Sequence, residues 1–294
     1  MNATDYATLK SGAGLLALPG WGVLDVTGAD RTAFLHNLLS NDIKALAPGN
    51  SCRAALLTPA AKMIAELVVV TEVDRHWLLT PRACLASLLS TLDRYLITEQ
   101  VALSDRSGEW AIQALQGPKT PQLVSTLSGV RTAAYSMTGD AGVLLMAKST
   151  VPDLPPVGWD AVNVCRVEAG VPWWGADMDE HTLLPETGLE QQLASFTKGC
   201  YVGQEIVARM DTYGSASRKL MRVTCEGTEV PAAGDAIHLN GEEIGRITSA
   251  VFSPSLNRPV ALGYVKRPHY QTGTPVTVVC HGRSVSAVVE QRKG

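Results

Sequence analysis

The chain has 294 residues, of which 46% are hydrophobic and 18% charged, and this length can bury a sizeable core in one large or two ordinary domains. Its formal net charge of −3 argues against a dedicated nucleic-acid-binding protein, whose domain is usually clearly basic, so we expect no direct nucleic-acid partner. Apolar runs such as residues 67–70 are far shorter than the roughly 20 residues of a membrane-spanning helix, and residues 1–11 do not resemble a signal peptide, so we expect a cytoplasmic protein without a membrane partner.

The first third of the chain mixes strand and helix patterns. Val23–Val26 is typical of a short strand, and apolar residues at helical spacing predict a helix through residues 34–39 that Asp30 could cap. Further strands are expected over Arg53–Leu57, Ile64–Glu72 and His76–Thr80. Leucines at helical spacing then predict a helix over Arg82–Leu96.

From Val101 onward this pattern repeats in outline, with strands near 110–115 and 142–147 and a short helix near 121–127. Strands interleaved with helices, without strict alternation, favour α+β layers. After residue 217 the sequence becomes rich in Val, Thr and Gly, with turn signals such as Asn240-Gly241, which is typical of a small β-barrel. We therefore predict an α+β core of two similar halves over residues 1–217 and a C-terminal barrel over 218–294.

The six cysteines are scattered along the chain, with no C-x-x-C pair. This spacing argues against a structural zinc site or a self-contained iron–sulfur cluster, and we expect no stably bound metal. An even number of cysteines does not indicate disulfides in a cytosolic protein of this size. We expect most of the cysteines to be small core residues.

The densest functional signal is the run Lys198, Gly199, Cys200, Tyr201, Val202, Gly203, Gln204 and Glu205. A thiol placed just before a helix that starts near Gln204, and two residues after a lysine, would have a stabilised thiolate. A thiolate is a better nucleophile and a better soft-metal ligand than a thiol. In an isolated K-x-C sequence, however, a buried cysteine beside a solvated lysine would be the commoner arrangement.

This run resembles the K-G-C-Y-x-G-Q-E signature of the YgfZ family, which includes a mitochondrial iron–sulfur assembly factor. The resemblance covers nearly the whole chain: Trp21–Asp30 is similar to the family's opening strand and turn, and Arg166–Gly170 to the R-x-E-x-G shared with glycine-cleavage (GcvT-like) aminomethyltransferases. It implies a GcvT/YgfZ-like folate-binding core of ferredoxin-like layers around a central cavity, followed by a small β-barrel.

The resemblance also implies which residues bind tetrahydrofolate or a one-carbon derivative of it. The family's R-x-E-x-G glutamate pairs with the pterin, which points to Glu168, with Arg166 beside it; a carboxylate can accept two hydrogen bonds in a planar fork. Trp21 matches a tryptophan near the folate, and an aromatic face suits a flat ring. Trp159 is a further candidate from its place in the sequence. Outside such motifs, Glu168 would more often be a surface or ion-paired residue and Trp21 a core residue.

One stretch departs from the aminomethyltransferases. They carry G-G-x-x-D-D-L, with the catalytic aspartate in the acidic pair, whereas this chain has Ala65 and Glu66 at those two places. Glutamate is one methylene longer than aspartate, and a misplacement of about 1 Å can cost roughly a hundredfold in rate. We therefore predict that glycine-cleavage aminomethyl transfer is absent.

Three functions are compatible with the sequence. The first is a tetrahydrofolate-binding accessory protein that supports iron–sulfur cluster assembly or repair and, through it, iron–sulfur enzymes such as tRNA-modifying ones. Its partners would be folate and iron–sulfur proteins or assembly factors, and Cys200 and Lys198 its expected catalytic residues; one thiolate cannot hold a cluster alone, because clusters ordinarily take four ligands. The second is a folate-dependent aminomethyl or other one-carbon transferase that uses Glu66. The third is a non-catalytic interaction module that binds no folate.

Overall fold

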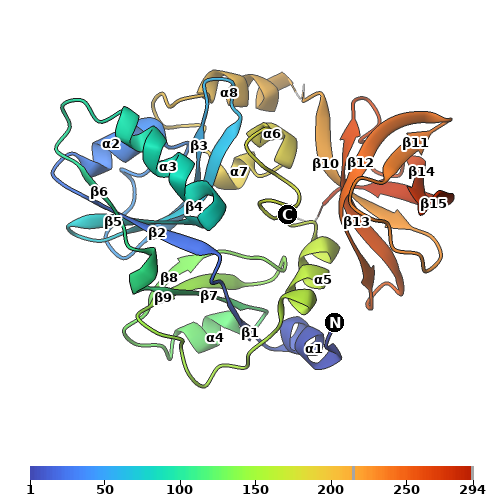
Figure 1. Ribbon diagram of the computed structural model, residues 1–294, viewed down its shortest axis with the longest axis horizontal. Helices are drawn as coiled ribbons and strands as arrows, with labels where there is room; N and C mark the ends of the chain where they lie inside the picture. The colour runs from blue at the N-terminus through green and yellow to red at the C-terminus, as the bar shows by residue number, and fades with distance from the viewer. Residues whose placement is uncertain (214–215, 293–294) are drawn as a thin grey trace.

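The computed structural model describes residues 1–213 and 216–292 and contains two antiparallel sheets and a closed barrel (Figure 1). The first sheet has five strands in the order β3-β4-β5-β2-β6. Their bounds are β2 (Trp21–Thr27), β3 (Ser51–Leu57), β4 (Met63–Thr71), β5 (Arg75–Pro81) and β6 (Ala102–Asp105). Helices α2 (Arg31–Leu38) and α3 (Arg82–Arg94) bury their apolar side chains against one face of this sheet.

The second sheet has four strands in the order β1-β7-β9-β8. These strands are β1 (Gly14–Ala17), β7 (Ala111–Gln116), β8 (Arg131–Ala134) and β9 (Gly142–Ala147). A short 3₁₀ helix, η1 (Ser107–Glu109), leads into β7, and α4 (Thr120–Val124) packs on the outer face of the sheet. Apolar side chains from the inner faces of the two sheets, such as Val68 and Leu144, meet in one core.

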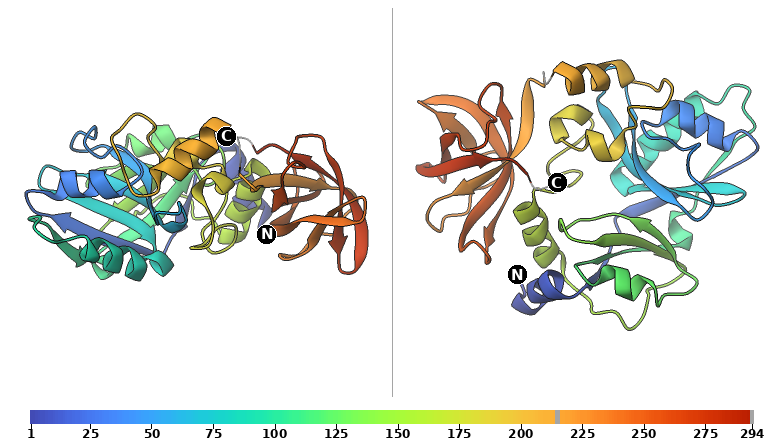
Figure 2. Two further views of the ribbon diagram at one scale, coloured as in Figure 1. Left: turned by 90° about the horizontal axis from the view of Figure 1, so that it is seen from above. Right: turned by 180° about the vertical axis from the view of Figure 1, so that it is seen from behind.

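Four helices connect this two-sheet core to the barrel. Helix α5 (Trp159–Ala169) packs between α1 (Ala3–Ser11) and the barrel (Figures 1 and 2). The short helices α6 (Leu184–Thr187) and α7 (Glu190–Leu193), followed by α8 (Gln204–Tyr213), form a separate apolar cluster with residues of β3 and β4.

The barrel closes in the order β10-β13-β12-β11-β14-β15. Its strands are β10 (Arg218–Cys225), β11 (Ala236–Leu239), β12 (Glu242–Ser253), β13 (Arg258–Lys266), β14 (Pro275–Cys280) and β15 (Arg283–Glu290). Inward-facing residues such as Val223, Ile237 and Val278 are fully buried and fill its interior. The predicted fold class, an α+β core followed by a small β-barrel, is confirmed.

Three local features differ from the sequence-based expectations. Asp30 does not cap α2; its carboxylate accepts the backbone N–H of Gln100 at 2.7 Å, which fixes the turn before β6. Residues 3–11, for which we predicted no helix or strand, form a helix. The R-x-E-x-G segment lies on α5, so Arg166 and Glu168 point in different directions and do not form the pair that a strand would allow.

None of the described helices is long and apolar enough to cross a membrane.

Candidate functional site

A groove of about 430 Å³ lies where the two sheets of the core meet. It is lined by residues of β3, of the β8–β9 connection and of α7, among them Asn41, Cys52, Arg53, Ala134, Tyr135 and Gln192. A smaller cavity of about 130 Å³ shares Ser136 and Gln192 with this groove and also touches Arg292, which follows the last barrel strand. The volume of the larger groove is common for ligand sites, which measure roughly 300–1,000 Å³ and present a few convergent polar groups.

Arg53 is the central polar residue of the groove. Its guanidinium lies 4.8 Å above the Tyr135 ring centroid, donates from Nη2 to Glu66 Oε1 at 2.5 Å, and donates from Nη1 to Gln192 Oε1. Burial lowers the pKa of Arg53, but the Glu66 carboxylate more than offsets this effect, so the pKa lies above its ordinary value. Arg53 therefore remains a cation that joins β3, β4, α7 and the end of β8.

Glu66, which the sequence resemblance puts at the place of one acid of the aminomethyltransferase pair, is 1% exposed. The Tyr135 hydroxyl donates to the same oxygen that Arg53 binds, at 3.4 Å, and burial together with Glu66 raises the pKa of Tyr135, which keeps this hydroxyl protonated. Ala65, at the other place of the pair, is fully buried and carries no polar group.

Two of the predicted folate-binding residues belong to an aromatic cluster beside the groove. The Trp21 ring meets Tyr135 edge-on at a centroid distance of 5.3 Å and lies 6.4 Å from Trp173, which in turn lies 4.8 Å from Trp159. Trp21 is buried, and its indole N–H has no hydrogen-bond partner among the described residues. Such a buried, unpaired donor is uncommon in proteins and calls for a structural or functional explanation.

The structure places Glu168 away from this cluster, at the contact of α5 with α1 and the barrel. Its carboxylate accepts hydrogen bonds from the hydroxyls of Tyr6 at 2.9 Å, Ser253 at 2.6 Å and Ser255 at 2.9 Å, and the Lys10 ammonium lies 3.7 Å away. Glu168 is not one of the residues that line the groove, so its predicted role as pterin partner stays a prediction.

Arg166 also faces the barrel. It donates to Asn163 Oδ1 at 2.8 Å, to Asp177 Oδ2 at 2.6 Å and to Ser249 Oγ at 2.8 Å. Arg166 and Asp177 are both almost completely buried. In the structure, Arg166 thus connects α5, the segment after it and strand β12.

Lys198, in the signature run, turns toward the C-terminal end of α2. Its ammonium donates to the backbone carbonyls of His36, of Leu39 at 2.7 Å and of Asn41 at 3.1 Å, and lies 5.1 Å from the Tyr201 ring centroid. Burial lowers the pKa of Lys198 to about 8 and raises that of Tyr201 to about 12. A cation at this place stabilises the helix by satisfying carbonyls that have no partner within it.

Cys200 is the exposed thiol of the six and lies four residues before the first residue of α8. The other thiols are buried or partly buried, and burial raises the pKa to about 12 for Cys52, Cys84, Cys165 and Cys225. Exposure of Cys200 permits contact with a partner or a small thiol, while its activation by Lys198 stays a prediction.

The two glycines of the signature differ in their surroundings. Gly203 has φ +85°, and an added Cβ would lie 2.7 Å from the Thr58 carbonyl oxygen, so this glycine lets the chain pack closely on the β3–β4 turn. At Gly199 an added Cβ would meet no atom within 4 Å. Gln204 and Glu205 begin α8, and Glu205 is exposed.

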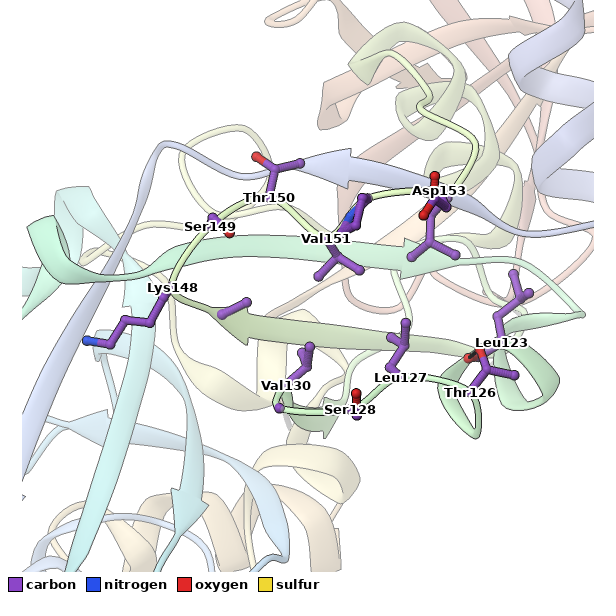
Figure 3. Close-up of a pocket in the computed structure, with 14 residues that line it drawn as sticks. Leu123, Thr126, Leu127, Ser128, Val130, Lys148, Ser149, Thr150, Val151 and Asp153 are labelled. Atoms are coloured by element: carbon purple, nitrogen blue, oxygen red, sulfur yellow. Dashed lines mark hydrogen bonds between the residues drawn. The ribbon is translucent and has the colours of Figure 1, made fainter.

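A larger cavity, of about 570 Å³, lies on the outer face of the four-stranded sheet (Figure 3). Its walls are two loop segments, residues 126–130 and 148–154. None of its lining residues, all within the described part of the chain, is aromatic, and its charged groups are Lys148 and Asp153. The lining of the groove, in contrast, includes the aromatic ring of Tyr135 and the guanidinium of Arg53.

Sequence reasoning missed three residues of the groove, Arg53, Tyr135 and Gln192. A signal for Arg53 existed: Ala55 pairs with Glu66 across β3 and β4, and Arg53 lies two residues along the same strand, on the same face. A cation and an anion on one face of two apolar strands predict a buried pair. Tyr135 and Gln192 come from distant parts of the chain and carry no comparable pattern.

No group of three or more His, Cys, Asp or Glu side chains able to hold a metal ion occurs among the described side chains, those of residues 1–210 and 216–292.

Comparisons with known proteins agree with this architecture. Residues 2–139 match the family model described as the GCVT N-terminal domain, and residues 218–293 match the glycine cleavage T-protein C-terminal barrel domain. An aminomethyltransferase of Synechococcus sp. (strain RCC307) is 28% identical over 98% of this chain and 89% of that protein. One from Symbiobacterium thermophilum is 27% identical over 97% of this chain and 87% of that protein.

The fold also matches a solved structure, the glycine cleavage system aminomethyltransferase T from Bartonella henselae. The TM-score is 0.84 at 21% identity, and the match covers 99% of this chain and 88% of that one. The two family models, the relatives and the shared fold lead to one conclusion: the chain belongs to the GcvT-like aminomethyltransferase superfamily.

Proposed function

We propose that this protein binds tetrahydrofolate, or a one-carbon derivative of it, in the groove between the two sheets and acts as an accessory protein of the YgfZ type. In this role it supports the assembly or repair of iron–sulfur clusters, with Cys200 as its functional thiol, and does not transfer aminomethyl groups. The relatives' name, aminomethyltransferase, supports the folate-related chemistry, and the details of the groove separate the chain from that activity.

The observation that carries the proposal is the groove itself. It combines the Tyr135 ring, the cation Arg53 and the amide of Gln192 in a space of about 430 Å³, and the Trp21 cluster lies directly behind Tyr135. A flat, polar heterocycle can stack on an aromatic ring and accept hydrogen bonds from a guanidinium or an amide. The indole N–H of Trp21, which has no partner among the described residues, is a further donor behind Tyr135.

Two features favour an accessory role over aminomethyl transfer. Glu66 is paired with Arg53, and Ala65 supplies no second carboxylate, so the acidic pair of the enzymes has no equivalent here. The signature run adds an exposed thiol at Cys200, two residues after Lys198, whose ammonium donates a hydrogen bond to the Leu39 carbonyl. Because a single thiolate cannot hold a cluster, this thiol would act together with a partner protein or a small thiol.

The folate proposal is tested by isothermal titration calorimetry with tetrahydrofolate and its one-carbon derivatives. Ala134 is exposed and lines the groove, so Ala134→Trp fills the site with little risk to folding. We expect wild type to bind and Ala134→Trp to lose at least tenfold in affinity. Ser128→Trp, an exposed position that lines the outer cavity of Figure 3, is the matched control and should bind as wild type does.

The alternatives predict different results in the same assays. A one-carbon transferase would form methylenetetrahydrofolate from an aminomethylated carrier protein, and this activity should depend on Glu66. A non-catalytic interaction module would show no binding of any folate. Binding that Ser128→Trp abolishes and Ala134→Trp preserves would move the site to the outer cavity.

The role of Cys200 is tested separately from folate binding. We expect Cys200→Ser to bind tetrahydrofolate normally but to fail to restore iron–sulfur enzyme activity in a strain that lacks the gene. Alkylation of Cys200 should be slower in Lys198→Met than in wild type if Lys198 activates the thiol, and an equal rate would mean that the Lys198 ammonium serves only the carbonyls of α2. Lys44→Met removes an exposed lysine and serves as a control. Full rescue by Cys200→Ser would make this thiol dispensable.

A further inference from the structure

A further cavity, of about 470 Å³, lies at the opposite end of β8 from the groove, and we call it the Arg131 cavity. Arg131 is the first residue of β8 and lines this cavity, whereas Ala134, the last residue of β8, lines the groove. Trp77 on β5 and Trp110, which precedes β7, line the Arg131 cavity from the two sheets. Among the described residues none lines both spaces, so a ligand of one need not touch the other.

Arg131 is held in place by three neighbours. Its Nε donates to Glu72 Oε1, and its guanidinium lies 4.8 Å from the Trp110 ring centroid and 5.6 Å from that of Trp77. The side chain is 32% exposed, and Nη1 and Nη2 have no hydrogen-bond partner among the described residues. A fixed guanidinium with two free nitrogens can bind a carboxylate or a phosphate through two parallel hydrogen bonds.

The two tryptophans of the cavity add buried donors that lack a protein acceptor. Their rings meet edge-on at a centroid distance of 5.4 Å, and Trp77 is 5% exposed. The Nε1 atoms of Trp77 and Trp110 are both buried, and neither has a partner within the part of the chain that the structure describes. Buried donors without a partner are uncommon and call for an explanation. A ligand rich in acceptors fits a cavity lined by such donors.

The charges of the cavity are unevenly arranged. Its described lining contains four cations and four carboxylates. Arg75 donates to Asp25 Oδ2 and to Asp74 Oδ2, each at 2.9 Å, and Asp25 Oδ1 has no described partner. These two carboxylates surround one cation, so the Arg75 end of the cavity does not attract an anion. The rest of the lining has three cations against two carboxylates and favours an anion beside Arg131.

Lys148, which follows β9, supplies a second cation beside the Trp110 ring. Its ammonium lies 3.7 Å from the Trp110 ring centroid and 3.7 Å from Glu109 Oε2, which is too far for a hydrogen bond. The side chain is 64% exposed, and in Figure 3 it points away from the labelled residues of the outer cavity. Because a lysine has a flexible stem and rotatable donors, this ammonium can approach an anion that Arg131 holds.

We propose that the Arg131 cavity binds the carboxylate or phosphate group of a small ligand, with Arg131 as the anchor and Lys148 as the second cation. Its volume of about 470 Å³ suits a small molecule. The site is independent of the folate proposal, because it lies outside the groove. If the ion pairs only sealed the edge of the core, the cavity would bind no anion.

The test is isothermal titration calorimetry at constant ionic strength, with inorganic phosphate and succinate as separate probes. We expect saturable binding of at least one probe, and the tighter one identifies the preferred group. Arg131→Met should lose about tenfold or more in affinity. Arg131→Lys keeps the charge without the two-nitrogen end and should also bind more weakly than wild type. Arg246→Met, which removes an exposed arginine paired with Glu243 on the barrel, should bind as wild type does.

Absence of saturable binding in wild type would overturn the proposal, and so would wild-type affinity in folded Arg131→Met or in Arg131→Lys. If circular dichroism shows that Arg131→Met does not fold, Lys148→Met decides: a loss of about threefold supports the site, and unchanged affinity overturns it. Lys148 also lines the outer cavity, so Ser128→Trp, which fills that cavity, should bind normally. Loss of binding in Ser128→Trp, or in Ala134→Trp, would place the anion elsewhere and overturn the proposal.

Discussion

Arg166 and Arg53 are each paired with an acid, but their surroundings in this molecule differ. Arg166 pairs with Asp177 where α5 meets the barrel, and every nitrogen of its guanidinium donates to a described partner. Arg53 pairs with Glu66 in a groove, and its Nε has no partner among the described residues. The second arginine lines a groove that a ligand could fill.

This comparison indicates that the hydrogen bonds a polar side chain already makes are a better guide to a ligand site than a sequence motif. The R-x-E-x-G segment resembles a ligand-binding sequence, yet the polar atoms of Arg166 and Glu168 form hydrogen bonds with neighbouring elements. The Ala65-Glu66 stretch resembles a degenerate catalytic pair, yet Glu66 binds Arg53, which lines the groove. The following predictions test this contrast, beginning with the largest effect.

The buried ion pair between Arg166 and Asp177 should cost more stability to break than an exposed ion pair. Arg166→Met leaves Asp177, whose side chain is 0% exposed, without its counter-charge, and removal of one partner of a buried ion pair costs about 3–5 kcal/mol. Denaturant unfolding measures this loss in the free energy of unfolding. Arg106→Met, which breaks the exposed pair with Glu109, should cost only about 0–1 kcal/mol. If Arg166→Met and Arg106→Met lost the same free energy of unfolding, Arg166 would not stabilise the contact between α5 and the barrel.

Glu168→Ala should lower stability, and the same variant tests the predicted role of Glu168 as the pterin partner. It removes the acceptor of three hydroxyl groups, and an unsatisfied buried polar group costs about 1–3 kcal/mol. Thermal unfolding and tetrahydrofolate calorimetry on the same samples separate the two effects, with Glu168→Gln as the control that retains an acceptor. A tenfold loss of affinity at normal stability would support Glu168 as the pterin partner, and unchanged affinity would contradict that role.

Lys198 extends the comparison to a buried cation whose partners are backbone carbonyls. Burial lowers its pKa in the folded state from 10.5 to about 8, so between these pH values the unfolded chain holds a proton that the folded chain has released. The free energy of unfolding should therefore rise with pH across this window, by at most about 1.4 kcal/mol per pH unit. Below about 8 the lysine is charged in both states and adds no slope. Subtraction of the Lys198→Met curve isolates this contribution, and identical slopes would contradict it.

The smallest effect is expected for Tyr135→Phe. This change removes one long hydrogen bond to Glu66 and keeps the ring under Arg53, so the loss of stability should be about 0.5–1 kcal/mol. Tyr135→Leu removes the ring as well and should lower both stability and tetrahydrofolate affinity. If Tyr135→Phe lost as much affinity as Tyr135→Leu, the hydroxyl and not the ring would be the contact that matters.

Much of the fold was predictable because it depends on local patterns. Strand β9 was expected at its observed bounds, and the change to short strands with turns was expected where β10 begins, since alternation and turn residues act over a few positions. Helix α1 was missed because its apolar residues do not gather on one side; Leu9 alone is buried there.

The candidate site was less predictable because it depends on contacts between distant segments. Arg53 and Gln192 are 139 positions apart in the sequence and meet only in the folded chain. The signature run was found because its residues are contiguous, but the direction in which Lys198 points depends on the end of α2, more than 150 positions earlier. Motif matching located the right segments and could not assign the partners of their side chains.

Strand β1 links the two halves of the core during folding. It belongs to the four-stranded sheet, where Leu15 pairs with Leu115, while β2, the next strand in sequence, pairs within the other sheet (Figure 1). The second sheet is therefore complete only after the chain has closed a loop of about 100 residues, a late and entropically costly event. The four-stranded sheet is not a continuous piece of chain, since β2 to β6 lie between β1 and β7, so the two sheets should gain and lose structure in one cooperative transition, and the groove between them with it.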